Sequence, residues 1–546
     1  MLTIRAWSFL ILCFSCTAIA DATGSSHLVR RAETTYADLN DAASIEGAID
    51  AGSIASFRNR GRDAWERIVR AKSDQLRIEL AALSGQHLAP ADARVVAVLR
   101  RKLDSFAEAP APSAGQAHAC DDAGRRELDY AGLRAALVQC FVEKGNNIAF
   151  GNDSIDRASA LGLLSQLDDA GQRKALFLAF VPLWTAVNGK DEADSAYRRL
   201  VALSAADAAK HGSPLDAAAR SLGVQGADIE RWLEQILEAW RSVDAGPPVE
   251  PWDYRYVTGE ADRLLAAAIP RESLESINER FYLDLGADLK GLGVIYDLDP
   301  RPGKSSVAYT DFVVHGRWAG GRWQPTVARV LATYSRGGLS SLNELVHENG
   351  HAVHISAIRS RPAYVDWPED LFTEAFADVS SWSTYEPAWQ RRYLGRSAPE
   401  RASLRALYGS VMLDVAWALF EIRMLEAPGS DPNAVWTDLA GRYLNIAPHP
   451  ELSWWAVRVQ LVDLPGYMVN YGLGAVLTAD LREHLKKVLG SIDTGNPRWY
   501  PLLSRQLLRF GSERDTRELL KRFLGRPVSP RALLAELARM GAAPSD

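Results

Sequence analysis

Hydrophobic residues recur along much of the chain at the three- and four-residue spacings of amphipathic helices. Between residues 43 and 243, Gly and Pro separate successive segments of this kind, and no fixed-period repeat relates them. We expect the N-terminal half of the chain to be helical. The pattern predicts helices that include Asp63–Leu83, Ala91–Phe106, Leu128–Lys144, Asp156–Leu167 and Ile229–Val243.

The periodicity changes after Asp244–Pro251, a Gly- and Pro-containing stretch that is the clearest linker in the chain. Strand-like patterns follow over Leu292–Asp299 and Ser306–Val314, and His315–Gly321 is typical of a turn. A further β-rich run covers Thr326–Tyr334. The sequence therefore predicts a mainly α protein in which a small sheet precedes a second set of helices.

The first helix after this sheet, Ser341–Ser360, contains His-Glu-x-x-His as His347, Glu348 and His351. Residues four apart lie on one face of a helix, so both imidazoles can face a single point. Glu348 lies beside that point, where it can take a proton from a water held by zinc. Buried-face positions and possible caps support the helix: Leu342, Leu345, Val346, Val353 and Ile355, with Ser340 or Ser341 at its start.

Two other interpretations of this motif exist. A surface helix can carry two unrelated histidines, and a structural zinc site can use two histidines with a fourth protein ligand. Structural sites usually contain cysteine, and no cysteine lies near this segment. The His-Glu-x-x-His pattern is therefore more typical of a catalytic zinc site.

A catalytic zinc site needs a third protein ligand, and Glu374, 23 residues after His351, is the candidate. Trp367–Asp370 combines a proline with acidic residues, as at the start of a helix. Asp378 lies one turn after Glu374 and can accept a hydrogen bond from the outer nitrogen of a ligand histidine. Alternatively, these acids are ordinary solvated positions of a helix.

Composition restricts the class of protein. Of the 546 residues, 47% are hydrophobic and 24% are charged, which indicates a folded globular chain. The net charge of −6 argues against a nucleic-acid partner. A chain of this length forms two or more core-forming units or one large helical body.

The first twenty residues have the features of a signal peptide. Arg5 gives a positive start, Trp7–Ala20 is apolar, and Ala18-Ile19-Ala20 matches a cleavage site. The apolar run is too short to span a membrane, and no other stretch is long enough. We expect an exported protein, periplasmic or secreted, without a membrane span after cleavage. A lipoprotein anchored through Cys16 is a poorer alternative, because the residues before it fit that signal badly.

After cleavage only Cys120 and Cys140 remain. An even pair of cysteines in an oxidising compartment predicts a disulfide, which here would tie the Ala- and Pro-rich residues 109–119 to the following helix. Two buried thiols are the alternative.

An ordered set of segments resembles the thimet oligopeptidase and oligoendopeptidase family of zinc metallopeptidases. The resemblance covers about residues 250 to 540. The Glu374-Ala-Phe-Ala-Asp378 segment is also similar to angiotensin-converting enzymes. The matching segments are Trp252–Tyr256, Tyr296–Lys304, Gly337–His354, Asp370–Glu374, Pro465–Tyr471, and Gly511-Ser512 followed by Glu518–Lys521.

The resemblance implies a mostly helical ellipsoid in two parts with a deep active-site channel between them. After the signal peptide (1–20), we expect an N-terminal helical region (21–245) followed by a zinc peptidase domain (246–546). The resemblance also implies one zinc ion per chain and an endopeptidase (oligopeptidase) that cleaves short unstructured peptides, because a folded protein cannot enter such a channel. A monomer is favoured.

The same resemblance suggests how the reaction would proceed. Glu348 would be the general base, and Tyr471 or Tyr467 would donate a hydrogen bond to the carbonyl oxygen that becomes negative. Each tyrosine can also be an ordinary core residue. His354, one turn after His351, can face the site or pack behind it.

Two departures from the family pattern bear on activity. Asn349 stands where the family commonly has an aromatic residue, and Gln460–Asp463 lacks the usual histidine. A donor would then come from elsewhere, such as His315 or His449. Two further classes of function therefore stay open. One is a catalytically weakened, peptidase-like zinc protein that binds peptides, and the other is a zinc amidohydrolase acting on a non-peptide amide.

Overall fold

The computed structural model describes residues 5–50, 52–53, 61–108, 120, 127–301, 304 and 307–544. Within these ranges, residues 5–25, 50, 105–108, 211 and 214 are described by their backbone alone. The structure confirms the expected mainly α fold with small sheets. Its N-terminal helices are α1 (Arg5–Asp50), α2 (Arg62–Ala82), α3 (Pro90–Glu108), α5 (Tyr130–Gly145), α6 (Arg157–Leu163), α7 (Ala170–Leu178), α8 (Val181–Asn188), α9 (Ala196–His211), α10 (Pro214–Leu222) and α11 (Gly226–Val243).

Helices also make up most of the remaining chain. They begin with α12 (Tyr254–Thr258), α13 (Glu260–Leu265), α14 (Leu274–Asp284), α15 (Leu339–Ala357), α16 (Asp370–Ser381) and α17 (Pro387–Leu394). They continue with α18 (Glu400–Glu426), α19 (Pro432–Leu444), α20 (Gln460–Asp463), α21 (Met468–Leu489), α22 (Trp499–Gln506), α23 (Thr516–Leu524) and α24 (Arg531–Ala542).

The helices predicted from hydrophobic spacing are α2, α3, α5, α6 and α11, and their observed ends lie close to the predicted ones. The largest difference is at α6, which ends at Leu163 rather than Leu167. Residues 164–167 form tight turns instead, and the side chain of Asp169 then caps the next helix, α7, by accepting a hydrogen bond from the Gln172 amide.

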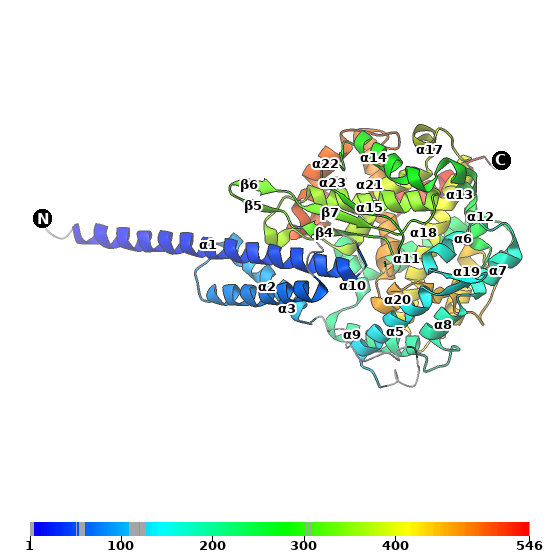
Figure 1. Cartoon of the computed structure of the whole chain (residues 1–546), viewed down its shortest axis with the longest axis horizontal. Coiled ribbons are helices and arrows are strands. Elements are labelled where there is room, and N and C mark those ends of the chain that lie inside the picture. Colours follow the sequence, from blue (N-terminus) through cyan, green and yellow to red (C-terminus); the bar gives the residue numbers. More distant parts are fainter. Residues whose placement is uncertain are drawn as a thin grey trace.

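α1, α2 and α3 form a layer beside the main body (Figure 1). They share a small core that includes Val29 and Leu99. Arg361, in the loop before α16, ties this layer to the body, because its guanidinium pairs with Glu33 at 2.6 Å and with Asp92 at 2.7 Å. The layer is therefore held by charge as well as by apolar contact.

The N-terminal end of α1 projects beyond the body (Figure 1). Residues 1–4 and the side chains of residues 5–25 lie outside the described part, so the signal peptide over residues 1–20 stays a prediction. Among the described residues, no helix combines the length and apolar character needed to cross a membrane.

The predicted sheet is present and has three strands in the order β3-β7-β4: β3 (Ile295–Asp297), β7 (Val327–Leu331) and β4 (Tyr309–Val314). β3 is parallel to β7, and β4 is antiparallel to it, with Thr310 opposite Val330. Ser306, the predicted start of the second strand, lies outside the described residues. β4 ends the strand order, so it is an edge strand of this sheet.

The stretch His315–Gly321, predicted as a turn alone, is part of a β-hairpin. β5 (Arg317–Ala319) pairs with β6 (Arg322–Gln324), and Trp318 lies opposite Trp323. Gly320 and Gly321 connect the strands with φ values of 56° and 75°. A two-residue hairpin turn needs positive φ at both positions, which glycine adopts without steric cost.

The predicted linker Asp244–Pro251 is a fixed connection rather than a free one. Val249 pairs with Ile446 as an isolated parallel bridge. The Asn445 amide donates to the carbonyls of Gly246 and Pro247, each at 2.8 Å. These bonds satisfy the backbone of a segment that contains three prolines and a glycine.

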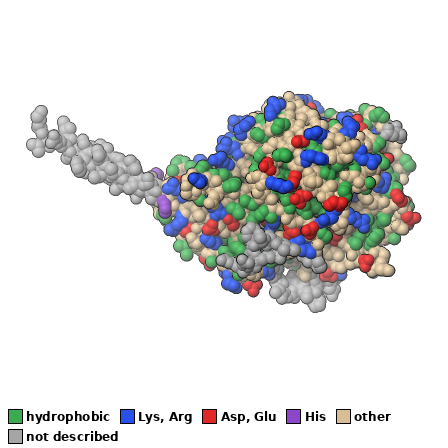
Figure 2. Space-filling view, turned by 45° about the horizontal axis from the view of Figure 1, so that its top comes forward, with side chains coloured by type: hydrophobic (Ala, Val, Ile, Leu, Met, Phe, Trp, Pro, Cys, Tyr) green, Lys and Arg blue, Asp and Glu red, His purple; other side chains and the backbone are tan. Residues whose placement is uncertain are grey.

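One large hydrophobic core contains residues from both sides of the expected boundary at residue 245. Leu133 and Trp240 from the N-terminal side and Trp417 and Leu473 from the C-terminal side all belong to it. The division into two regions stays a prediction. On the outside, Figure 2 shows acidic and basic side chains interspersed over the visible face.

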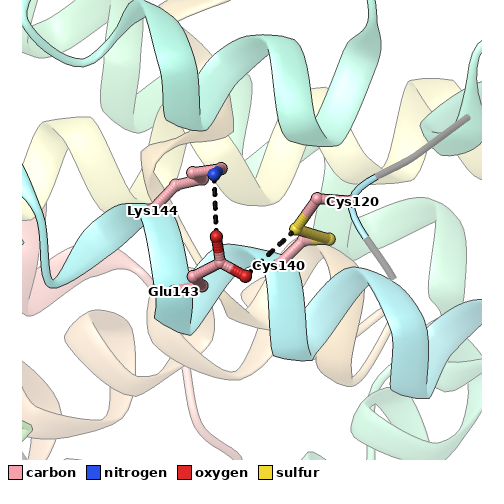
Figure 3. Close-up of a disulfide and its surroundings, with 4 residues drawn as sticks. All are labelled: Cys120, Cys140, Glu143 and Lys144. Carbon is pink, nitrogen blue, oxygen red and sulfur yellow. Dashed lines mark hydrogen bonds and ion pairs between the residues drawn. A yellow bond between two sulfur atoms is a disulfide. The ribbon is translucent and has the colours of Figure 1, made fainter. Parts of the chain in front are cut away.

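The structure joins Cys120 to Cys140 of α5, with Cα atoms 5.3 Å apart (Figure 3). Residues 109–119, the loop that this bond was expected to tie down, lie outside the described residues. Cys140 itself is buried in a small cluster with Ala136 and Ala186.

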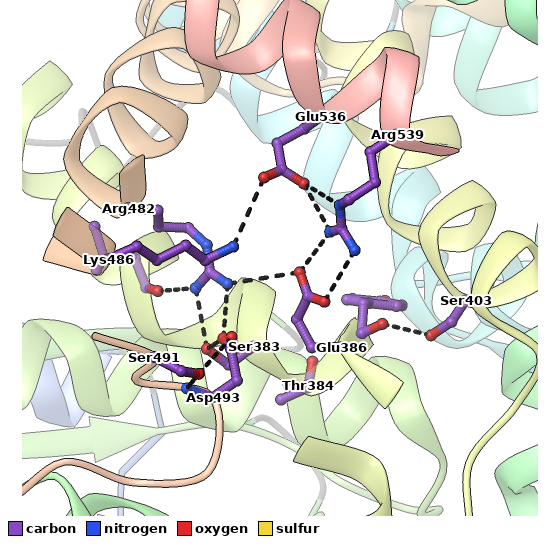
Figure 4. A network of polar contacts seen from close by, with 12 residues as sticks. Ser383, Thr384, Glu386, Ser403, Arg482, Lys486, Ser491, Asp493, Glu536 and Arg539 are labelled. Carbon is purple, nitrogen blue, oxygen red and sulfur yellow. Dashed lines mark hydrogen bonds and ion pairs between the residues drawn. The ribbon is translucent and has the colours of Figure 1, made fainter. Parts of the chain in front are cut away.

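A buried network of ion pairs fixes α21 in place (Figure 4). Arg482 of α21 pairs with Asp493 at 2.9 Å, and Arg539 of α24 pairs with Glu386 at 2.7 Å. Arg482 also donates to the main-chain carbonyl of Val379 in α16. The network therefore holds α21 against α16, and these two helices carry candidate site residues.

Protein purified without reductant is expected to have no free thiol at Cys120 or Cys140. The bond closes a loop over 20 residues, so changing both cysteines to Ser should lower the free energy of unfolding by ~3 kcal/mol through a less restricted unfolded chain. Thiol labelling with peptide mapping and urea unfolding measure the two effects. Labelling of both residues in the folded, unreduced protein would show that the pair is not oxidised.

Candidate metal centre

The centre is built on α15, whose buried face is the predicted one: Leu342, Leu345, Val346, Val353 and Ile355 are all buried. The expected cap at Ser340 or Ser341 is wrong. The N-cap is Gly338, with φ of 104°, and no side chain of the helix caps it. Asp262 of α13 does so instead, because its carboxylate accepts a hydrogen bond from the Ser340 amide at 2.9 Å.

α15 and α16 lie in unusually close contact at Gly350, inside the His-Glu-x-x-His motif. A Cβ atom at this position would lie 2.6 Å from the Cα atom of Ala377 and 2.9 Å from its carbonyl oxygen. Only glycine therefore allows the two backbones to approach this closely. α16 begins with Asp370, as the sequence predicted, and its closeness to α15 carries Glu374 to the histidines.

His347, His351 and Glu374 form the one group of potential metal ligands found among the described residues. Their donor atoms lie within 4.8 Å of one another. The Nε2 atoms of the two histidines are 3.1 Å apart, and they lie 3.4 Å and 3.9 Å from Oε2 of Glu374. Ligands at ~2.1 Å around a tetrahedral zinc ion are separated by about 3.4 Å, so this donor set fits zinc.

The predicted partner of a ligand histidine is also in place. Asp378 lies 2.7 Å from Nδ1 of His347, and the Ser381 hydroxyl donates to the same carboxylate at 3.0 Å. Burial alone would lower the pKa of His347, but Asp378 and Glu374 together raise it well above its ordinary value. With Nδ1 held by Asp378, Nε2 is the nitrogen directed to His351 and Glu374.

The pKa values of the other two donors, His351 and Glu374, are also shifted. Burial, and then the charge of His347, lowers the pKa of His351 to about 3, which keeps this imidazole neutral. Burial would raise the pKa of Glu374, but its contact with His347 and the charges of both histidines lower it. His351 is thus a neutral imidazole and Glu374 a carboxylate, the protonation states in which these side chains bind a metal, whereas His347 has to release a proton when a metal binds.

Glu348 is buried next to the donors and lines the same cavity. Burial raises its pKa to about 7, although His347 and a hydrogen bond act in the opposite direction. That bond comes from the Thr310 hydroxyl of β4, which donates to Oε2 of Glu348 at 2.7 Å. A carboxyl group with a pKa near neutrality can accept and return a proton.

The cavity has a volume of about 530 Å³ and is lined by α15, α16, α18, β4 and the start of α21. Tyr467 immediately precedes α21 and Tyr471 lies in its first turn, and both line the cavity. Burial, followed by the charge of Glu374, raises the pKa of each phenol, which keeps both hydroxyls protonated as donors. The Gln460 amide donates to the Tyr471 hydroxyl at 3.2 Å, and Glu421 accepts from the Met468 amide at 2.8 Å.

Three other histidines lie away from this cavity. His354 is packed among the rings of Trp367, Phe372 and Phe376, and neither ring nitrogen has a partner among the described residues. Burial lowers its pKa to about 3. It therefore supports α15 against α16 by packing, and no hydrogen bond joins it to a predicted ligand.

His315 and His449, expected as substitutes for the missing family histidine, do not line the cavity. Nδ1 of His315 lies 2.8 Å from Asp41 of α1. His449 contacts Glu250 and Glu451 at the surface. Asn349, the other departure, accepts a hydrogen bond from the Tyr296 hydroxyl at 2.6 Å and so joins α15 to the sheet.

The sequence did not reveal several residues that line the cavity. Trp367 contacts the ring of His351 with centroids 5.6 Å apart, and Thr310 holds Glu348. Asp414 of α18 also lines the cavity and pairs with Arg458. Trp367 stands in the segment predicted to start a helix, but nothing in the sequence places Thr310 or Asp414 near the motif.

Solved structures of similar fold include an M32 carboxypeptidase from Deinococcus radiodurans R1, with a TM-score of 0.56 and 15% sequence identity. That match covers 95% of this chain and 99% of the other. PZ peptidase A, solved with an inhibitor, has a TM-score of 0.57 and 15% identity over 95% and 96% of the two chains. A structure assigned to oligoendopeptidase F has a TM-score of 0.55 and 16% identity over 93% and 85%.

No protein-family model and no curated protein sequence matches this chain. At these low identities the likeness establishes the fold. It also extends over nearly the whole chain, whereas the resemblance in sequence is limited to the C-terminal half.

Glu374→Ala is expected to weaken metal binding strongly, because two imidazoles alone hold zinc poorly. Asp370→Ala is the matched control, since Asp370 lies one turn earlier on α16, lines the same cavity and is not one of the grouped donors. Zinc titration with a competing chelator measures the two affinities. If both variants bind zinc as tightly as the unaltered protein, the third ligand is a residue other than Glu374.

Proposed function

We propose that this chain is a zinc-dependent peptidase that hydrolyses short, unstructured peptides. One observation carries the proposal: three metal-ligating side chains converge in a cavity that also holds a buried carboxyl group, Glu348, and two tyrosine hydroxyls. This is the set of groups that amide hydrolysis requires, namely a metal site, a general base and donors for a developing oxyanion.

His347, His351 and Glu374 would hold one zinc ion per chain. Two nitrogens and one carboxylate oxygen leave a fourth position open, as in catalytic rather than structural zinc sites. Bound there, zinc would supply a Lewis acid that lowers the pKa of water and polarises a carbonyl group.

Two features support peptides as the substrates. Thr310 and its neighbours on the edge strand β4 line the cavity, and an extended peptide can add to a sheet edge through main-chain hydrogen bonds. The cavity, at about 530 Å³, admits a few residues and excludes a folded protein. The solved structures of similar fold are also named as peptidases.

The protein's own residues would divide the work as follows. Glu348 accepts a proton from the attacking water and passes it to the leaving amine. Asp378 fixes the tautomer of His347, and Thr310 fixes the carboxyl group of Glu348. Tyr471 and Tyr467 donate to the carbonyl oxygen as it becomes negative.

The position of the scissile bond is the finer part of this proposal. The sequence resemblance favours endopeptidase cleavage of oligopeptides, whereas an M32 carboxypeptidase is among the structures of similar fold. Endopeptidase and carboxypeptidase cleavage both require the same catalytic groups at the metal centre. They differ in how the end of the substrate is held.

We also propose that the chain is exported and that the signal peptide is removed before Asp21. The A-x-A pattern at Ala18–Ala20 supports this, as does the Cys120–Cys140 pair, because disulfides persist in oxidising compartments.

Glu348→Gln is expected to retain about one zinc per chain and to lose at least ~10²-fold in turnover, because only the base is removed. A quenched-peptide library and metal analysis test this together. Glu348→Asp keeps the carboxyl group on a shorter side chain, so this variant should lose less turnover than Glu348→Gln. Normal zinc content with no hydrolysis by the unaltered protein would favour a peptide-binding protein or an amidohydrolase with another substrate.

Tyr471→Phe is expected to lower kcat by a factor of ~10² to 10³, the usual cost of losing one donor to an oxyanion. KM and zinc content should change little, because the phenyl ring keeps the packing. Tyr467→Phe is the paired variant, and a smaller loss is expected there. Steady-state kinetics on one peptide compares the two, and near-normal kcat for Tyr471→Phe would reduce this residue to a packing role.

A further inference from the structure

The helix that carries Tyr471 begins without a cap of its own. Tyr467 is the N-cap residue of α21, and its side chain forms no capping hydrogen bond. This side chain lines the metal cavity instead. Ser, Thr, Asp and Asn are the usual N-cap residues, because the first amides of a helix have no partner within it. The cap of α21 therefore has to come from another part of the chain.

Glu421 of α18 supplies this cap. Its carboxylate accepts a hydrogen bond at 2.8 Å from the amide of Met468, the first residue of α21. Only 2% of Glu421 is exposed. Burial raises its pKa to about 8, whereas the amides of Gly466 and Met468 act to lower it. Glu421 thus interacts with the backbone on both sides of Tyr467.

A close contact between α18 and α21 keeps Glu421 next to the amides that it caps. A Cβ atom at Gly472 would lie 2.8 Å from the Cβ atom of Ala418, so glycine allows the two helices to approach this closely. Ala418 and Glu421 lie one turn apart on α18, and Met468 and Gly472 lie one turn apart on α21. The same two helix faces therefore meet at the cap and at the residue that follows Tyr471.

The turn before α21 couples the two tyrosines to this cap. Gly466 has a φ of 98°, a conformation that glycine adopts without steric cost. The Tyr467 amide donates to the carbonyl of Leu464 at 2.8 Å, and the Asn470 amide donates to the carbonyl of Tyr467 at 2.9 Å. The rings of Tyr467 and Tyr471 are in contact, with centroids 5.7 Å apart. A shift of this turn would therefore move both hydroxyl groups.

A buried acid is a costly cap for a helix. Within the described part of the chain, no Lys, Arg or His forms an ion pair with Glu421, and its Oε1 atom has no hydrogen-bond partner. Burial of a carboxylate without a basic partner costs free energy. A Ser or Asn at position 467 would cap the helix locally and avoid this cost, but it would remove a phenol from the cavity. The cost is thus linked to the presence of a tyrosine at the N-cap.

We propose that Glu421 is a positioning residue that holds the hydroxyl groups of Tyr467 and Tyr471 in place for the reaction. This inference rests on the proposed peptidase function and adds a residue to it. Glu421 does not line the metal cavity, which α18 reaches through residues such as Ser410 and Asp414. It would therefore act on the reaction only through α21. A displacement of ~1 Å at a catalytic group can lower the rate by ~10²-fold.

Glu421→Ala is expected to lower kcat by at least about tenfold with KM and zinc content little changed, because the tyrosines are displaced while the metal ligands are not. Glu421→Gln should lose about threefold, since its uncharged amide oxygen can still accept from Met468. Asp480→Asn is the matched control. Asp480 is a buried acid further along α21 that accepts from Arg526 at 2.8 Å, so its loss should lower the thermal unfolding temperature and leave kcat near normal.

Removal of the tyrosine hydroxyls separates positioning from general stability. In a protein that already carries Tyr467→Phe and Tyr471→Phe, Glu421→Ala should lower kcat by less than about twofold, because no hydroxyl group remains to be positioned. A tenfold loss in that background would overturn the proposal, as would a near-normal kcat for Glu421→Ala alone. If Glu421→Ala does not fold, Glu421→Gln takes its place in each comparison.

A binding experiment tests the same role without turnover. A phosphinic peptide carries a tetrahedral phosphorus whose oxygen stands for the oxyanion, and its affinity is compared by calorimetry with that of the amide peptide of the same sequence, both in Glu348→Gln. Adding Glu421→Ala should weaken the phosphinic peptide by at least about tenfold and the amide peptide by less than about twofold. Equal effects on the two ligands would contradict the proposal. Absent hydrolysis by the unaltered protein counts against the proposed function alone and leaves this comparison intact.

Discussion

The site depends on the close contact of α15 and α16 at Gly350 and Ala377. This contact brings a carboxylate from one helix to two imidazoles on the other, and any side chain at Gly350 would separate them. Several surrounding features preserve it. His354 packs among the aromatic residues of α16, and α21 holds the far side of α16 through Arg482. The metal centre is thus a product of backbone packing, with the ligands carried by two rigid helices.

Charge within the cavity follows from the same arrangement. Glu374, Asp378 and Glu348 are brought close to two histidines in one cavity, and a divalent cation would balance their charge.

The sequence predicts those parts of the site that depend on the spacing of residues within one helix. The i, i+4 spacing of His347 and His351 and the acid pattern of α16 anticipated the grouping seen in the structure. Contacts between distant segments were not accessible: Asp262 caps α15 across 78 residues, and Thr310 holds Glu348 across 38. The β5–β6 strands were too short to show an alternating pattern, so only their glycine turn was visible.

The central claim is that two imidazole nitrogens and one carboxylate oxygen hold zinc. X-ray absorption at the zinc edge of the purified protein tests it most directly, because it reports the ligand atoms themselves. The account predicts only nitrogen and oxygen neighbours at about 2.0 to 2.2 Å, two of them from imidazole. Sulfur at ~2.3 Å, or a zinc ion without two imidazole ligands, would contradict it.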